Sequence, residues 1–316
     1  MTGEFDLIER IRQRAGSAPG VLVGIGDDAA VVAPAAGQAL IITTDTLVEG
    51  RHFLADWPPE DIGHLALAVN LSDLAAMAAN PRWGLLSLTL PRADADWLDR
   101  FLDGFLPLAH GHGLTLIGGN LSSGPLSITV QVLGESRPDS VVLRHSANAG
   151  DLVAITGVPG EAAAALTLGA GAPDSLQQRL RRPSPRVAAA LALQPWITSM
   201  ADISDGLLAD LGHLLRPDQG ADILLAKLPV SDALRQAVSD TQERWALQLN
   251  GGSDYELLLT VPPAAFESAL SACHSAGVEL TVIGQVNVSG HVRCLDANGL
   301  AQPFNPRGWD HFVTSD

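Results

Sequence analysis

Short apolar runs alternate with longer amphipathic stretches through the first half of the chain. This pattern is typical of strands and helices that follow one another. The apolar runs predict strands at residues 21–32, 39–50, 83–91, 114–119 and 126–135. The longer stretches predict helices at residues 59–80 and 94–113. Residues 136–140, SRPDS, are typical of a linker.

The second half restarts the same kind of pattern. It predicts strands at residues 151–157, 221–230, 254–261 and 278–286, and helices around residues 182–186 and at 205–215 and 263–277. Adjacent strands within each half favour α+β sheets over one doubly wound sheet. A chain of 316 residues is also longer than one compact core usually holds. We therefore predict an α+β protein with domains at residues 1–139 and 140–316.

The charge of the chain limits the classes of partner that it is expected to bind. With a formal net charge of −16, it is not expected to bind nucleic acid or an anionic membrane surface. Lys227 is the sole lysine, so a phosphate site built on any other lysine is excluded. The sequence also has no GxxxxGK[ST] loop, and no HRD or DFG motif follows Lys227.

Two cysteines, Cys273 and Cys294, are too few for a disulfide framework or a structural zinc site. The N-terminal sequence lacks the apolar core of a signal peptide, and polar residues interrupt every long apolar stretch. We expect a cytoplasmic protein in a reducing compartment.

Aspartates follow two of the predicted apolar strands. Asp27 and Asp28 come after a Gly-Ile-Gly turn, and Asp45 ends the triplet Thr43-Thr44-Asp45. Taken singly, each is equally typical of an Asx turn or a helix cap. Five acids in such places across both halves instead favour an oxygen-only site for Mg²⁺, which is a hard cation.

Asp73 interrupts an almost wholly apolar helix. Asn70 lies three residues before it, so the two side chains share a helix face. A carboxylate on a buried helix is costly unless it is paired or metal-bound. The sequence leaves a salt bridge and a metal ion both open for Asp73.

Residues 202–206, DISDG, precede a predicted helix. Ser204 or Asp205 would serve as an N-cap. The same geometry would also let the helix N-terminus receive a phosphate while the acids hold its cation. The N-cap alone does not account for Asp202.

Two glycine-rich segments complete the candidate chemistry. Gly118-Gly119-Asn120 follows a predicted strand, where close backbone approach would suit a phosphate. Residues 157–161, GVPGE, precede an alanine-rich helix, and turn chemistry explains that segment equally well.

In order along the chain, these motifs resemble the thiamine-monophosphate kinase family. The resemblance runs through GEFDLIERI, GIGDDAAVV, TTDTLVEGRHF, AVNLSDLAAMAANP, LIGGN, RPSPR, DISDGLLADLGH and GGSDYELLLTV to GWDHF. It covers nearly the whole chain. It implies the two-domain architecture of aminoimidazole ribonucleotide synthetase, with a mixed or antiparallel N-terminal sheet, and a homodimer formed through the N-terminal sheets. The second domain would complete the active site.

The resemblance also implies ATP-dependent phosphorylation of thiamine phosphate to thiamine diphosphate, assisted by several Mg²⁺ ions. The implied metal-binding residues are Asp28, Thr43, Thr44, Asp45, Asp73, Asn120, Asp202 and Asp205. The implied ATP-binding residues are Gly119, Asn120, Arg144 and Ser204. The implied substrate-binding residues are His52, Ser253 and Trp309.

Two positions depart from the family pattern. Asn120 stands where the family usually has aspartate, and Ser253 where it usually has glutamate, with Asp254 as a candidate substitute for that acid. These positions leave open a non-catalytic or weakened paralogue that binds nucleotide or thiamine phosphate. Another ATP-dependent enzyme of the same superfamily is a further alternative. The missing N-terminal cysteine disfavours a selenophosphate synthetase, and the cysteine-free tail disfavours a hydrogenase-maturation relative.

The acceptor in the implied reaction is itself a phosphate monoester. Its second pKa is near ~6, so it is mostly a dianion at neutral pH. Such an acceptor needs no general base, and we expect no covalent or general-base residue. Positioning and charge neutralisation would carry a direct in-line transfer.

Overall fold

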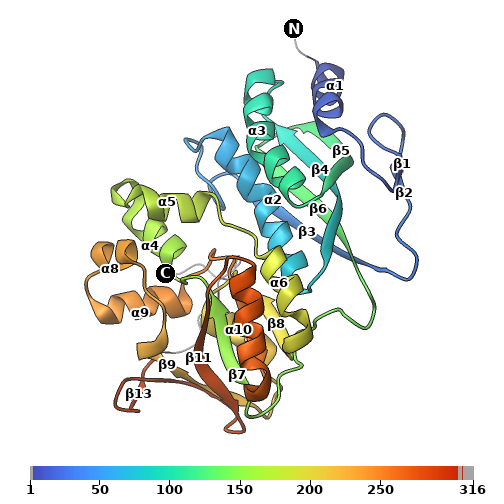
Figure 1. Ribbon diagram of the computed structural model, residues 1–316. Coiled ribbons are helices and arrows are strands. Elements are labelled where there is room, and N and C mark those ends of the chain that lie inside the picture. The colour runs from blue at the N-terminus through green and yellow to red at the C-terminus, as the bar shows by residue number, and fades with distance from the viewer. Residues whose placement is uncertain (1–2, 305–307, 309–316) are drawn as a thin grey trace. The chain divides into compact units, whose positions relative to one another are not determined.

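The computed structural model describes residues 3–304 and 308, and these divide into two compact units. Unit 1 comprises residues 1–74 and 79–141, and unit 2 comprises residues 75–78 and 142–316. Each unit has its own sheet and its own covering helices (Figure 1). Across the described residues, no helix combines the length and the hydropathy of a membrane span.

Unit 1 is built on a four-stranded sheet in the order β3-β6-β4-β5. Its β4–β5 pair is parallel and the other two pairs are antiparallel. The strands are β3 (Ala39–Val48), β4 (Asn80–Leu90), β5 (Thr115–Ser123) and β6 (Ser127–Ser136), with a separate hairpin of β1 (Val21–Val23) and β2 (Val31–Val32). The helices are α1 (Glu4–Ala15), α2 (Pro59–Ala76) and α3 (Ala95–Gly111).

Helices α2 and α3 lie along one face of this sheet (Figure 1). The strands alternate accordingly, because successive side chains point to opposite faces. In β6, for example, Ile128, Val130 and Val132 are fully buried and the residues between them are partly exposed. The other face of the sheet leaves Leu40 and Ile42 of β3 exposed.

Unit 2 is built on a seven-stranded sheet in the order β13-β12-β9-β11-β7-β10-β8. The β12–β9 pair is parallel and the others are antiparallel. The strands are β7 (Leu152–Thr156), β8 (Ser199–Asp202), β9 (Gly220–Leu224), β10 (Leu257–Val261), β11 (Leu280–Asn287), β12 (Val292–Leu295) and β13 (Ala301–Gln302). The helices are α4 (Glu161–Leu168), α5 (Asp174–Arg181), α6 (Val187–Leu193), α7 (Leu207–Leu214), α8 (Asp232–Ala237), α9 (Thr241–Asn250) and α10 (Phe266–Ser275).

Strands β10 and β8, at one end of the unit 2 sheet, are buried throughout, which means that both faces of the sheet are covered there. Every residue of β8 and β10 is buried. One core joins α7, through Leu207, Leu211 and Leu214, to Ile155 and Leu258 of the sheet. Helix α10, which carries the buried Cys273, packs against α6. Cys273 and Cys294 are both free and buried.

The structure corrects several element predictions. Residues 21–32 form two short strands with a turn between them, because Gly24, Gly26, Asp27 and Asp28 are turn residues. The strand predicted over 221–230 ends at Leu224 and continues as a short 3₁₀ turn. The strand predicted at 114–119 extends to Ser123, so that Asn120, predicted to follow it, lies inside β5. The sequence reading missed α1, β8, α8, α9, β12 and β13.

Candidate functional site

A cluster of polar groups joins β3 to α2 in unit 1. The Thr43 hydroxyl donates a hydrogen bond of 2.6 Å to Asp73 Oδ2. Two residues further along β3, the Asp45 N–H donates a hydrogen bond of 3.1 Å to Asn70 Oδ1. Asn70 is fully buried and its amide donates to the Ala66 carbonyl within the helix. The predicted shared face of Asn70 and Asp73 therefore packs on β3.

Burial and the neighbouring charge of Asp73 both disfavour the ionised form of Asp45. The pKa of Asp45 is raised from 3.8 to about 6, first by desolvation and then by the negative charge of Asp73. A divalent cation would relieve both effects, because it supplies opposite charge to a partly desolvated site. Carboxylate, hydroxyl and amide oxygens are also the ligands that Mg²⁺ accepts. The donor set around Asp45 therefore fits that ion.

Thr44 does not join this cluster. Alternation along β3 places its side chain on the sheet face that α2 and α3 leave uncovered, and its hydroxyl donates to the Val130 carbonyl at 3.0 Å. The sequence groups Thr43, Thr44 and Asp45 as one triplet, whereas the strand divides their side chains between the two faces.

Gly119 and Asn120 lie in β5, at the opposite edge of the same sheet. Strand register aligns Asp45 with Val130, Val130 with Leu86, and Leu86 with Gly119. Three strand spacings of about 4.8 Å separate the ends of this row by roughly 14 Å. The Asn120 side chain is exposed, and its partner in the register is Ser87. Within one chain, Asn120 therefore does not reach the Asp45 cluster.

Close packing fixes glycine at position 119. A Cβ there would lie 1.8 Å from the Leu86 carbonyl oxygen, and φ is +150°. With this backbone conformation, a side chain at position 119 would point into β4. Packing within the sheet therefore requires glycine at position 119, in addition to any role beside a phosphate.

His52 and Asp28 lie in two tight turns of unit 1. The His52 Nδ1 accepts the Val48 N–H at 3.0 Å. With Nδ1 as the acceptor, the neutral ring carries its proton on Nε2, which makes His52 a donor on that side. Asp28 is exposed in the turn between β1 and β2, where its N–H donates to Asp27 Oδ1. This contact reaches the next residue, whereas an Asx turn uses the N–H two residues on.

In unit 2, the DISD segment follows the edge strand β8. Asp202 is buried at the end of that strand, and Ser204 and Asp205 are half-buried in the turn after it. The N-cap position of α7 is occupied by Gly206, and no side chain caps it. The expectation that Ser204 or Asp205 caps the helix is therefore wrong.

Asp210 holds this turn from inside α7. Its Oδ2 accepts the N–H groups of Ser204, Asp205 and Gly206 at 3.0, 3.1 and 3.2 Å. Burial chiefly raises the pKa of Asp210, and the charge of Asp205 adds to the rise. The sequence reading missed Asp210. The feature that could have identified Asp210 in the sequence is an acidic residue inside the apolar stretch GLLADLGHLL.

The loop at residues 251–256 lies against the DISD turn. The Ser253 N–H donates to the Ser204 carbonyl, and the Tyr255 N–H donates to the Ile203 carbonyl, both at 2.9 Å. The structure thus brings Ser253 beside Ser204 and Asp205. Asp254, considered a substitute for the missing glutamate, instead places both carboxyl oxygens 2.9 Å from the Gly160 N at the start of α4.

A buried ion pair lies behind this loop. Arg186, from the RPSPR motif, donates through Nε and Nη2 to the two oxygens of Glu256, and the Thr156 hydroxyl donates to the same carboxylate at 2.6 Å. The side chains are 14% and 6% exposed. Neither residue was assigned a role from the sequence, because a motif does not show which of its charged side chains is buried in the folded protein.

Arg144 and Trp309 are the remaining predicted site residues. Arg144 is exposed in the segment that opens unit 2. Trp309 lies outside the described residues. Over residues 3–304 and 308, no group of three or more His, Cys, Asp and Glu side chains is arranged to hold a metal ion. The metal assignments therefore stay predictions.

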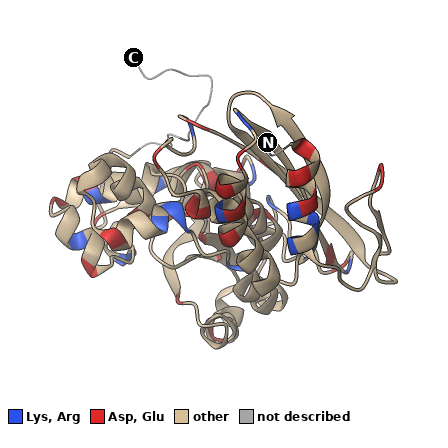
Figure 2. Ribbon diagram, turned by 90° about the horizontal axis from the view of Figure 1, so that it is seen from above, with Lys and Arg blue, Asp and Glu red and all other residues tan. Residues whose placement is uncertain are grey.

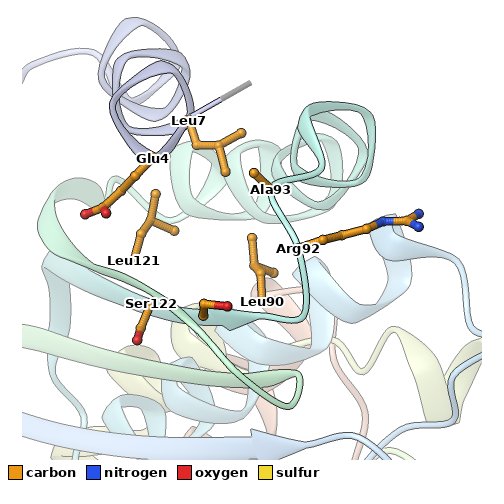
Figure 3. Close-up of a pocket in the computed structure, with 8 residues that line it drawn as sticks. Glu4, Leu7, Leu90, Arg92, Ala93, Leu121 and Ser122 are labelled. Carbon is orange, nitrogen blue, oxygen red and sulfur yellow. The ribbon is translucent and has the colours of Figure 1, made fainter. Parts of the chain in front are cut away.

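Charge and apolar surface outside these clusters show no comparable focus. Acidic and basic residues are interspersed along the helices (Figure 2). A pocket in unit 1 lies between α1 and the ends of β4 and β5, where Leu7, Leu90 and Leu121 point toward one another (Figure 3). None of the predicted site residues lines this apolar pocket.

The two units match known domain families in order. The family described as AIR synthase related protein, N-terminal domain, matches residues 26–136, and its C-terminal domain matches residues 148–296. Thiamine-monophosphate kinase from Escherichia coli strain K12 is 43% identical over 323 residues, with 99% of each chain covered. The chain belongs to the thiamine-monophosphate kinase family. This confirms the family and the two-domain α+β fold expected from the motifs.

Solved structures of the family agree with this assignment. The crystal structure of thiamine-monophosphate kinase from Stenotrophomonas maltophilia K279a has a TM-score of 0.88 and 40% sequence identity, covering 95% of this chain and 98% of that one. A structure described as AaThiL complexed with AMPPCP and TMP has a TM-score of 0.77 and 31% identity, covering 98% of this chain and 97% of that one.

Proposed function

We propose that this protein transfers a phosphoryl group from ATP to thiamine phosphate and so forms thiamine diphosphate. The observation that carries the proposal is the full-length match to thiamine-monophosphate kinases. A family member described as a complex with AMPPCP and TMP supports the same pair of ligands. The paired acids Asp45 and Asp73 add local support, because they form an oxygen-rich site suited to the Mg²⁺ that accompanies ATP.

The residues proposed to hold Mg²⁺ are Asp28, Thr43, Thr44, Asp45, Asp73, Asn120, Asp202 and Asp205. When bound, Mg²⁺ would neutralise charge that otherwise keeps the two phosphates apart. Arg144, Ser204, Gly119 and Asn120 are proposed to bind ATP. The thiamine phosphate side is proposed to include His52, Ser253 and Trp309.

The chain's own task in this reaction is positioning. The acceptor phosphate is mostly a dianion at neutral pH and attacks without a base. His52 donates a hydrogen bond through Nε2–H, because Nδ1 is engaged by the Val48 N–H. The Asp210 side chain fixes the backbone of Ser204 and Asp205. These groups hold the reactants in line, which is the main contribution an enzyme makes to phosphoryl transfer.

The purified protein, given ATP, Mg²⁺ and thiamine phosphate, is expected to form ADP and thiamine diphosphate in equal amounts. Product chromatography measures both. Tight ATP binding with zero turnover would refute the kinase and favour a binding paralogue, to which the uncharged Asn120 and Ser253 point. In that case, the double variant Asn120→Asp and Ser253→Glu should gain turnover that the unaltered protein lacks.

We also propose a homodimer through the uncovered face of the unit 1 sheet. Leu40 and Ile42 are 39% and 54% exposed there, on an edge strand. A second copy would cover them. This chain's own Asn120 lies roughly 14 Å from β3 by strand spacing.

Light scattering should give twice the chain mass of 33.0 kDa. Ile42→Asp should shift the protein to monomer, because it buries a charge in the proposed interface. An Ile42→Asp protein that remains dimeric would contradict this face. Leu166→Asp, at a 66% exposed position in unit 2, is the matched control and should stay dimeric.

A further inference from the structure

The loop at residues 251–256 has a backbone conformation that its own residues do not favour. Ser253 and Tyr255 have φ values of +64° and +50°. These lie in the left-handed region, which costs energy for residues other than glycine. Such a conformation persists only where the surroundings enforce it. Between these two residues lies Asp254.

Two sets of contacts hold the loop from opposite sides. On one side, main-chain bonds from Ser253 and Tyr255 reach the DISD turn. On the same side, Gly252 packs so closely that a Cβ would lie 2.3 Å from the Ser204 carbonyl oxygen. On the other side, both Asp254 oxygens face the Gly160 N–H at the start of α4, and the Ala162 N–H also hydrogen-bonds this carboxyl.

We propose that Asp254 is a positioning residue that fastens the loop to α4 and thereby holds Ser253 in its left-handed conformation beside Ser204. Asp254 then does not replace the family glutamate in contact with thiamine phosphate. The link to substrate rests on the proposed function, whereas the fastening itself rests on the geometry. Because Asp254 lies between the two strained residues, its anchor constrains both of them.

The chain offers a direct probe of the loop, because Tyr255 is its sole tyrosine. Labelling with 3-fluorotyrosine gives one ¹⁹F signal that reports on the loop without reference to activity. Asp254→Ala should shift or split this signal. Asp254→Asn should leave it near the wild-type position, because its amide oxygen still accepts the Gly160 N–H.

A second variant tests the strain directly. Ser253→Gly removes the cost of the left-handed backbone at that position. In the Asp254→Ala background it should return the ¹⁹F signal toward the wild-type position and recover part of the lost melting temperature. Asp296→Ala is the matched control, since Asp296 also accepts main-chain N–H groups, in an exposed turn. It should leave the Tyr255 signal unchanged.

Kinetics separate positioning from substrate contact. Asp254→Ala should raise the KM for thiamine phosphate by about tenfold or more through misplacement of the loop, and Asp254→Asn should restore it. A raised KM with an unchanged ¹⁹F signal would overturn the proposal in favour of direct contact. An unchanged signal with an unchanged KM would overturn it too. If the wild-type protein shows no turnover, the kinase proposal fails and the ¹⁹F comparison still decides this one.

Discussion

Replacing Asp45 with asparagine is expected to lower turnover by at least about a hundredfold and, at the same time, to stabilise the metal-free protein. The ionised Asp45 is disfavoured by desolvation and by Asp73, which raise its pKa from 3.8 to about 6. Such a shift corresponds to at most about 3 kcal/mol. Because Asp45 is only partly buried, we expect about 1–2 kcal/mol of stabilisation.

The sign of this effect depends on pH. Below about pH 4, Asp45 is protonated in both the folded and the unfolded states, so it imposes no cost. Between about pH 4 and 6 the unfolded chain loses its proton first, and the metal-free wild type loses stability as pH rises. Above pH 6 the full cost is present. The stability difference between the variant and wild type should therefore grow over this window and then level off.

Urea unfolding at several pH values, with and without Mg²⁺, measures this behaviour. Mg²⁺ at neutral pH should stabilise the wild type and do little for Asp45→Asn. Asp56→Asn, at an exposed acid of unit 1 outside the proposed site, should behave as wild type. Normal turnover and a full Mg²⁺ response in Asp45→Asn would refute the metal assignment.

Removing either partner of the Arg186–Glu256 pair is expected to cost about 3–5 kcal/mol of stability. Both side chains are largely buried, so a single substitution leaves one charge without its partner in a poorly solvated place. Arg186→Met and Glu256→Gln should each lower the urea midpoint strongly. The double variant should lose less than the sum of the two, because it leaves no uncompensated charge.

The pair Arg293–Asp222 provides the comparison within the same unit. It has similar geometry but side chains that are 44% and 27% exposed, and Arg293→Met should cost less than about 1 kcal/mol. If the Arg186 and Glu256 variants cost as little as this, or if their effects simply add, the pair is not the internal brace that its burial indicates.

Much of the fold could be predicted from local pattern. The period of apolar residues located α3 and β6 because each is long and strongly patterned, and α2 was located by its length as an apolar stretch. The pattern failed where turns interrupt apolar runs, as at Gly24–Asp28, and in short elements such as β8 and β13, which carry little periodic signal. The strand predicted at residues 114–119 runs on through Asn120 to Ser123, because the two glycines before Asn120 do not end it.

The sequence by itself determined the family and which residue types are present for chemistry, because ordered motifs survive as strings of letters. Only the tertiary structure decided which of them meet. Strand alternation separates Thr44 from Thr43 and Asp45, and the width of the sheet separates Asn120 from all three. Packing likewise made Asp254 and Arg186 internal anchors, through contacts with residues 94 and 70 positions away. Such contacts depend on how the chain closes on itself, and local sequence cannot specify them.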